Sequence, residues 1–448
     1  MIGLDSDAYI LLDDEFSLQH QCQTIYLQLF LLLHHHEVRL PQPTERCHPC
    51  LHGEEDGFKC TGRKGCLPMS LGLPLASCSI DDTVSDNEYR ERIQKSKQKL
   101  GDRVMILGHH YQRDSIVEHA DATGDSFRLS RMAADSTADH IVFCGVHFMA
   151  ESADILTNNQ QIVSMPTTRA GCSMADMANV PDVEECWHIL LEELDLQDPL
   201  SRENPDEIAN QDDNFLVPVT YMNSSAALKA FVGRHGGIVC TSTNAMGVLE
   251  WALSRAGGLG KVLFFPDQHL GRNTAFKMGF KSEDMVVWDP REIPDTSEIS
   301  AARFVLWHGY CSVHQRFTVN QIDNLRELHP GAMIVVHPEC NRKVVQAADA
   351  DGSTDFIRRY CEDAPSGSII GVGTEINLVQ RLNSKYPDKE IICLDDSVCP
   401  CSTMYMIHPR FLAEQLESII NGDERNIISI DKQTSSDAIM ALNRMLEV

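Results

Sequence analysis

The sequence lacks any apolar run of the roughly 18 residues that a membrane-spanning helix requires. The nearest approach is the stretch from Ile25 to Leu33. It follows the acidic residues Asp13, Asp14 and Glu15, whereas a signal peptide opens with a basic segment. We therefore expect no transmembrane segment and no export signal, and the sequence predicts a cytoplasmic protein.

Basic residues are also scarce. The 448 residues include 38 lysines and arginines against 65 aspartates and glutamates, which gives a net charge of −27. Nucleic acids and anionic membranes bind surfaces rich in lysine and arginine, so neither is an expected partner. With 43% hydrophobic and 23% charged residues the composition is that of a globular protein, and the length suggests two or three domains.

Cysteines are plentiful, but a disulfide framework is not expected in a cytoplasmic chain. The 16 cysteines are therefore buried thiols or metal ligands. Residues 1–85 are cysteine-rich and show no regular strand and helix alternation. Within them Cys47, Cys50, Cys60 and Cys66 weakly resemble a zinc site but fit no standard spacing. We interpret residues 1–85 as a disordered extension, or as a stretch upstream of the true start, for which Met69 is a plausible position.

From about residue 88 the pattern becomes regular, with short apolar runs separated by amphipathic stretches. Helices are predicted at Glu88–Leu100 and Ser115–Ala134, and surface loops at Glu192–Asn214 and Ser282–Ser300. The predicted strands are Arg103–Gly108, His140–Cys144, Phe215–Tyr221, Gly237–Thr241, Lys261–Phe265, Phe304–Trp307, Ala332–His337, Ser368–Val372 and Glu390–Leu394. Apolar strands alternating with helices predict an α/β fold whose parallel sheets are covered on both faces.

Polar clusters follow several of these strands. They begin at His109, Tyr221, Thr241, Asp267 and His337, and Cys311 with His314 follows in the same way after another strand. Any one cluster could be a helix cap or a buried histidine. In parallel sheets, however, ligands bind at the carboxyl ends of the strands, and the recurrence of polar residues at that position predicts a functional site there.

The same segments carry a family resemblance. The strings are GHHYQ (108–112), GDSFRLSR (124–131), FCGVHFMAESADIL (143–156), AGCSMADM (170–177), VTYMNSSAALKA (219–230), TSTNA (241–245), PDQHLGR (266–272), GYCSVHQRF (309–317), VHPEC (336–340) and CPCSTM (399–404). In this order they resemble those of quinolinate synthases. The resemblance runs from about residue 100 to 445. It is specific because so many family motifs occur in the same order.

The resemblance implies three αβα layered domains in a pseudo-threefold arrangement around a central active site. We place them at residues 86–171 together with 402–448, at 172–310 and at 311–401. The implied reaction condenses iminosuccinate with dihydroxyacetone phosphate to quinolinate in NAD biosynthesis and releases phosphate and two waters. An aspartate oxidase or dehydrogenase would supply the iminosuccinate.

The implied cofactor is a [4Fe-4S] cluster with one cysteine ligand from each domain. Carried over, these ligands are Cys172, Cys311 and either Cys399 or Cys401. Cys401 fits the family spacing to the following methionine without a gap, so we favour it. Cys144 precedes no ligand position and is interpreted as a buried thiol. Three ligands leave one iron open to act as a Lewis acid. The C-x3-C-x2-C triad that would indicate radical chemistry is not present, so radical chemistry is not expected.

The resemblance also implies the substrate contacts. They are His109, Ser126, Tyr221, Met222, Asn223, Ser242, His337, Pro338, Glu339 and Thr354. Glu339 is the candidate general base, and His109, Tyr221 and the nearby Tyr111 are candidates for proton transfer. Ser126 and Ser242 are expected to begin helices, where backbone N–H groups bind phosphate or carboxylate.

Two other functions fit part of the pattern. An aconitase-like hydro-lyase would use an open iron on another hydroxy acid, and it would release no phosphate from dihydroxyacetone phosphate. A zinc-binding regulatory or scaffold protein would explain the cysteine-rich segment at residues 1–85. An absorption spectrum distinguishes this second alternative, because an iron–sulfur protein absorbs visible light and a zinc protein does not.

Overall fold

The computed structural model describes residues 86–158, 160–204, 207–395 and 400–448. The extension predicted for residues 1–85, with its weak zinc pattern, lies outside the described residues, as does Cys399. The described chain is an α/β structure built on three sheets whose pairings are parallel except for one edge pair. This confirms the predicted fold class. Within the described residues no helix is both long and apolar enough to cross a membrane.

The first sheet has the order β14-β4-β3-β1-β2. Its strands are β1 (Val104–His109), β2 (Ala122–Gly124), β3 (His140–Cys144), β4 (Ile162–Ser164) and the antiparallel β14 (Ile427–Ile428). The associated helices are α2 (Asp86–Leu100), α3 (Asp114–Val117), α4 (Ser126–Asp135), α5 (His147–Leu156) and α15 (Pro409–Asn421). β3 is buried along its whole length, as expected for a central strand covered on both faces.

The second sheet has the order β6-β5-β7-β9-β8, and all its pairings are parallel. Its strands are β5 (Leu216–Tyr221), β6 (Ile238–Cys240), β7 (Lys261–Phe265), β8 (Met285–Trp288) and β9 (Phe304–Trp307). The helices that follow or precede them are α6 (Val180–Glu193), α7 (Ala226–Arg234), α8 (Ala245–Ala256), α9 (Gln268–Lys277) and α10 (Thr296–Ala301).

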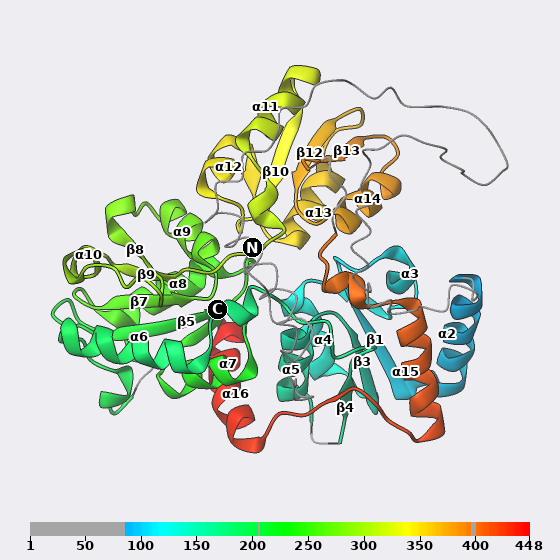
Figure 1. Ribbon diagram of the computed structural model, residues 1–448, viewed down its shortest axis with the longest axis horizontal. Helices are drawn as coiled ribbons and strands as arrows, with labels where there is room; N and C mark the ends of the chain where they lie inside the picture. Colours follow the sequence, from blue (N-terminus) through cyan, green and yellow to red (C-terminus); the bar gives the residue numbers. More distant parts are fainter. Residues whose placement is uncertain (1–85, 159, 205–206, 396–399) are drawn as a thin grey trace, which may run out of the picture. The chain divides into compact units, whose positions relative to one another are not determined.

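The third sheet has the order β11-β10-β12-β13. It comprises β10 (Met333–Val336), β11 (Ala350–Asp351), β12 (Ile369–Gly373) and β13 (Glu390–Cys393), with α11 (Val319–Leu328), α12 (Arg342–Ala347), α13 (Thr354–Asp363) and α14 (Ile376–Lys385). Side chains of β10 alternate between two cores. Ile334 and Val336 pack with residues of α11 and α12, and Val335 packs with residues of α13 and α14. The helices of this third unit are labelled in Figure 1.

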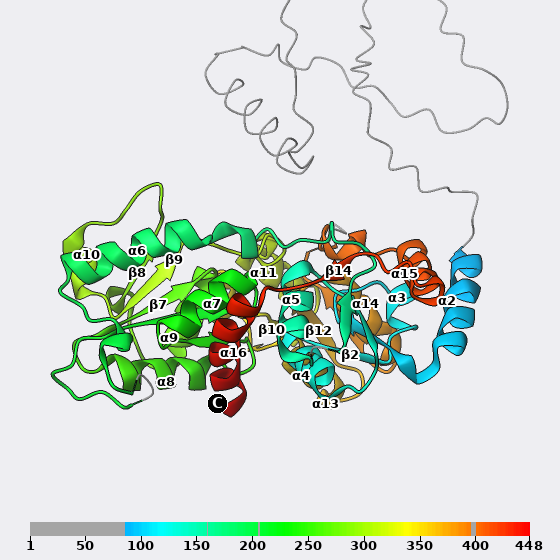
Figure 2. The same cartoon turned by 90° about the horizontal axis from the view of Figure 1, so that it is seen from below.

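Each sheet takes its strands from one of the three segments that the sequence analysis proposed as domains. The domain boundaries and the pseudo-threefold relation stay predictions. An extensive contact crosses the proposed boundaries, because α16 (Lys432–Glu447) belongs by sequence to the first segment but packs against α7 and β6 of the second sheet (Figure 2).

Two predicted elements were wrong in part. The helix predicted at Ser115–Ala134 is two helices, α3 and α4, separated by the edge strand β2. β2 pairs in parallel with β1, and the Asp121 carboxylate accepts a hydrogen bond from the Ile106 N–H at 2.8 Å. The loop predicted at Ser282–Ser300 contains β8, whose four residues pair with β9. Pairing with a neighbouring strand stabilises such short segments, and their own periodicity does not reveal it.

The close packing of α16 on α7 depends on Gly233. A Cβ atom at this position would lie 1.9 Å from the Asp437 carbonyl oxygen of α16. We expect Gly233→Ala to lower the free energy of unfolding by about 1–3 kcal/mol, the usual cost of overpacking. A urea titration of the purified variant measures this change.

Gly247 in α8 provides the matched control. An added Cβ there would meet only the Val448 side chain, at 2.9 Å, and Val448 is the exposed last residue of the chain. Alanine also stabilises a helix interior by roughly 0.5–1 kcal/mol relative to glycine, so Gly247→Ala should be neutral or stabilising. Equal stability of the two variants would show that the α7–α16 contact is not tight.

Candidate active site

The predicted site residues converge although they come from all three sheets. All of them except Pro338 line one cavity, namely His109, Tyr111, Ser126, Cys172, Tyr221, Met222, Asn223, Ser242, Cys311, His337, Glu339, Thr354 and Cys401. Pro338 is not a lining residue, and its carbonyl instead accepts a hydrogen bond from Asn273 Nδ2 at 2.8 Å. The cavity therefore lies where carboxyl ends of strands meet, as parallel sheets favour.

Strand ends account for the position of the main polar groups. β1 ends at His109 and β5 ends at Tyr221. β10 ends one residue before His337, and Glu339 follows in the turn that precedes α12. Asn341 is the N-cap of α12, so Glu339 is not the capping residue of that helix.

Three thiols in the cavity differ from the other cysteines nearby. Cys172, Cys311 and Cys401 are partly exposed, whereas Cys144 and Cys240 are fully buried, which confirms Cys144 as a buried thiol. Burial and, to a smaller extent, the neighbouring Cys401 raise the pKa of Cys172 to about 12. Burial likewise raises the pKa of Cys311, to which both of the other two thiols contribute. All three thiols line the same cavity.

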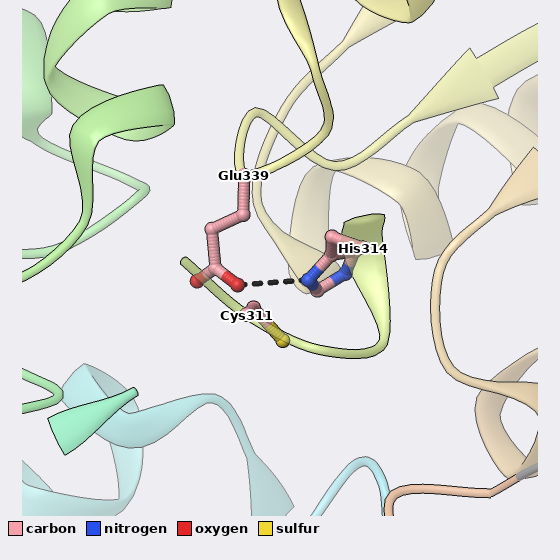
Figure 3. Close-up of side chains that lie close together, drawn as sticks. All are labelled: Cys311, His314 and Glu339. Atoms are coloured by element: carbon pink, nitrogen blue, oxygen red, sulfur yellow. Dashed lines mark ion pairs between the residues drawn. The ribbon is translucent and has the colours of Figure 1, made fainter. Parts of the chain in front are cut away.

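Glu339 is the most connected polar group of the cavity and is only 3% exposed. Its Oε1 accepts a hydrogen bond from Tyr221 Oη at 2.6 Å. Its Oε2 lies 2.8 Å from His314 Nδ1 (Figure 3). One ligand atom from each of Cys311, His314 and Glu339 lies within 4.8 Å of the others. Residues of the second and third sheets and of the loop after β9 thus meet at one carboxylate.

The surroundings of Glu339 favour its ionised form. Burial by itself would raise the pKa of this carboxyl, but the neighbouring His337 and His314 and the hydrogen bond from Tyr221 hold it below its usual value. Burial, followed by the charge of Glu339, raises the pKa of Tyr221 well above its usual value. At neutral pH the pair therefore consists of a carboxylate acceptor and a phenol donor.

A second chain of polar contacts leads from Glu339 to the other tyrosine of the cavity. His314 Nε2 lies 3.1 Å from Thr374 Oγ1, and Thr374 Oγ1 lies 2.8 Å from Tyr111 Oη. Which of Nε2 and Thr374 Oγ1 donates depends on the tautomer of His314. Hydroxyl, imidazole and carboxylate in this order can activate the hydroxyl as a base or nucleophile.

Two other histidines present N–H donors to the cavity. His109 Nδ1 accepts from the Tyr111 backbone N–H at 3.1 Å, and His337 Nδ1 accepts from the Glu339 N–H at 3.3 Å. Burial lowers the pKa of His109, and it lowers the pKa of His337 to about 3. Both rings are therefore neutral at pH 7 with the proton on Nε2, which can donate to an oxygen of a ligand.

Groups suited to anion binding border the same cavity. Ser126 is the first residue of α4 and Thr354 is the first residue of α13. Thr354 Oγ1 is buried and has no hydrogen-bond partner among the described residues. Ser242 does not begin a helix as expected, because α8 starts at Ala245 with Asn244 as its N-cap. Ser242 lies in the preceding turn. This turn is closed by hydrogen bonds from the backbone N–H and the hydroxyl of Thr241 to Asn244 Oδ1.

His314 and Thr374 join the site without a role predicted from the sequence. A signal existed for both, because each follows a strand of a parallel sheet, β9 for His314 and β12 for Thr374. His314 was noted only as a polar neighbour of Cys311. Thr374 comes directly after the apolar run of β12, at the same relative position as the residues that were selected.

Comparisons with known proteins agree with the motifs at this site. A family model described as quinolinate synthetase A protein matches residues 91–447. A quinolinate synthase of Corynebacterium glutamicum is 52% identical over 368 residues, which cover 81% of this chain and 88% of that protein. One of Nocardioides sp. is 49% identical over 396 residues, covering 85% and 96%. One of Bacillus anthracis is 45% identical over 368 residues, covering 82% and 94%. The chain therefore belongs to the quinolinate synthetase A family.

Proposed function

We propose that this protein is a quinolinate synthase, which condenses iminosuccinate with dihydroxyacetone phosphate to quinolinate and releases phosphate and two waters. This reaction would supply a precursor of NAD, and an aspartate oxidase or dehydrogenase would deliver the iminosuccinate. The observation that carries the proposal is the single cavity in which three cysteines and the contacts of Glu339 come together. Family membership supports the same reaction.

The cysteines would hold a [4Fe-4S] cluster through Cys172, Cys311 and Cys401. The three sulfur atoms do not all lie within 4.8 Å of one another, whereas two sulfurs on one zinc ion are at most about 4.6 Å apart, twice the zinc–sulfur bond. Their spacing therefore does not fit one zinc ion shared by all three thiolates. When bound, such a cluster with three thiolate ligands supplies an open iron that acts as a Lewis acid on a hydroxyl or carboxylate oxygen.

The protein side chains would bind the substrates through donors. Both substrates are anionic, and a protein with a net charge of −27 attracts anions only through local groups. The Nε2–H groups of His109 and His337, the free hydroxyl of Thr354 and the backbone N–H groups at the start of α4 are such groups. Ser126, Asn223, Ser242 and Met222 would complete the binding surface.

Proton transfers would use the groups joined to Glu339. The reaction must remove a proton next to a carbonyl, close a ring and expel two waters. We assign Glu339 as the base that finally receives the proton, with His314 relaying it from Thr374 and Tyr111. The lowered pKa of Glu339 keeps its carboxylate ionised at neutral pH, which is the form that can accept a proton. Tyr221 would donate a proton from its phenol.

The test uses the full chain purified under anaerobic conditions, with iminosuccinate formed from oxaloacetate and ammonium. We expect quinolinate and phosphate to appear in equal amounts after dihydroxyacetone phosphate is added. Absence of both products from iron-loaded protein would refute the proposal. Dehydration of a hydroxy acid without phosphate release would instead indicate an aconitase-like enzyme.

A further inference from the structure

The loop that carries Tyr111 is held by a helix of another sheet. This loop, residues 110–113, connects β1 of the first sheet to α3. Arg381 lies on α14, the helix between β12 and β13 of the third sheet. It donates from Nη1 to the His110 carbonyl at 2.9 Å and from Nη2 to the Gln112 carbonyl. Its Nε pairs with Asp114 Oδ1 at 2.6 Å. One guanidinium therefore holds two carbonyls of the loop and the first residue of α3.

The carbonyl between these two is held by the same helix. Asn377 Nδ2 donates to the Tyr111 carbonyl at 3.2 Å. Three consecutive carbonyls of the loop thus accept hydrogen bonds from side chains of α14. His110 and Gln112 are buried, so water cannot easily replace these hydrogen bonds. Leaving a buried carbonyl without a partner costs free energy.

Tyr111 is also held at its hydroxyl end by the beginning of α14. Its Oη lies 2.8 Å from Oγ1 of Thr374. Thr374 directly precedes Glu375, which is the N-cap of α14. The backbone and the hydroxyl of Tyr111 are therefore both hydrogen-bonded to residues in or next to α14. A shift of the loop relative to α14 would separate Tyr111 from the contacts that lead to His314 and Glu339.

We propose that Arg381 is a positioning residue, which acts from the third sheet to hold the loop of the first sheet so that Tyr111 meets Thr374 and His314. Its effect on turnover rests on the proposed function, whereas its effect on loop order does not. The role suits arginine in particular, since its planar fork reaches two carbonyls and a carboxylate at once and a lysine ammonium cannot reproduce that geometry.

The kinetic test compares Arg381→Ala and Arg381→Lys with the control Arg359→Ala. Arg359, on α13, is exposed and pairs with Asp355 at 3.2 Å, so its removal costs the same charge without touching the loop. We expect Arg381→Ala to lower kcat by about 10–100-fold, as small misplacements of reacting groups do, with KM changing less. Arg381→Lys should recover part of this loss, and Arg359→Ala should resemble wild type.

A double-mutant cycle separates positioning from general damage. If Arg381 acts through Tyr111, Arg381→Ala should cost little further activity in a Tyr111→Phe background, because coupled residues are not additive. Fully additive losses in the cycle, or normal kcat in Arg381→Ala, would overturn the proposal. Arg381→Lys keeps the test valid if the alanine variant does not fold.

Hydrogen exchange provides a readout that needs no enzyme assay. Peptides covering residues 109–117 should exchange faster in Arg381→Ala than in wild type, while peptides of the second sheet and the Arg359→Ala protein should not change. Unchanged exchange in this loop would refute the positioning role of Arg381. If the loop exchanges faster in Arg381→Ala but the wild-type protein forms no quinolinate, the positioning role is supported and the proposed function is refuted.

Discussion

Replacing Cys172, Cys311 or Cys401 by alanine should abolish both cluster assembly and quinolinate formation. Each thiolate is expected to hold one iron, and the cavity offers no second cysteine at any of the three positions among the described residues. Iron and sulfide content should fall close to zero, and the visible absorption of the anaerobically purified protein should disappear. The expected loss is larger than for any other variant, because both the cofactor and the reaction depend on it.

Buried cysteines outside the cavity provide the controls. Cys144 and Cys240 are fully buried in the core, and burial raises the pKa of both thiols well above the usual value. Cys144→Ala and Cys240→Ala should keep their iron. Cys399→Ala tests the third ligand. Loss of iron in Cys399→Ala together with full iron content in Cys401→Ala would show that the assignment of Cys401 is wrong.

Glu339→Gln should lower turnover by about 10²–10⁴-fold, the range for loss of a general base. Glutamine keeps the shape of the side chain but cannot receive a proton as a carboxylate does. It also has only one acceptor oxygen for the two donors, Tyr221 and His314, that now face the carboxylate. Steady-state kinetics measure the effect, and the cluster absorption should stay close to that of wild type.

The matched control is a carboxylate and imidazole pair elsewhere in the chain. Asp198 Oδ2 lies 2.6 Å from His235 Nδ1, and neither residue lines the cavity. Asp198→Asn should therefore retain normal turnover. Near-normal turnover in Glu339→Gln would remove Glu339 as the base and leave Tyr221 or Tyr111 as the next candidate. A large loss of stability in Glu339→Gln with normal kcat would indicate a structural role.

The sequence by itself determined the fold class and most of the cavity residues. Apolar runs such as those of β3 and β7 are buried on both faces, so their hydrophobicity identifies them without knowledge of their neighbours. A parallel sheet presents the residues after its strands at one edge. This local rule predicts the polar clusters that begin at His109, Tyr221 and His337, because their position depends only on where each strand ends, whereas Glu339 was selected by the resemblance to quinolinate synthases.

Tertiary structure alone decided which of these residues act on one another. Glu339 and His314 are 25 residues apart, and Tyr111 and Thr374 are 263 residues apart, so no local pattern relates them. The same holds for β2 and β8, which are too short to be stable without a neighbouring strand, and for α16, whose partner α7 is selected by the missing side chain of Gly233. Arg381 reads in sequence as an ordinary helix arginine, and only the packing of α14 beside the loop of β1 gives it three acceptors. Contacts between separate sheets depend on how the sheets pack, which the periodicity of one segment does not encode.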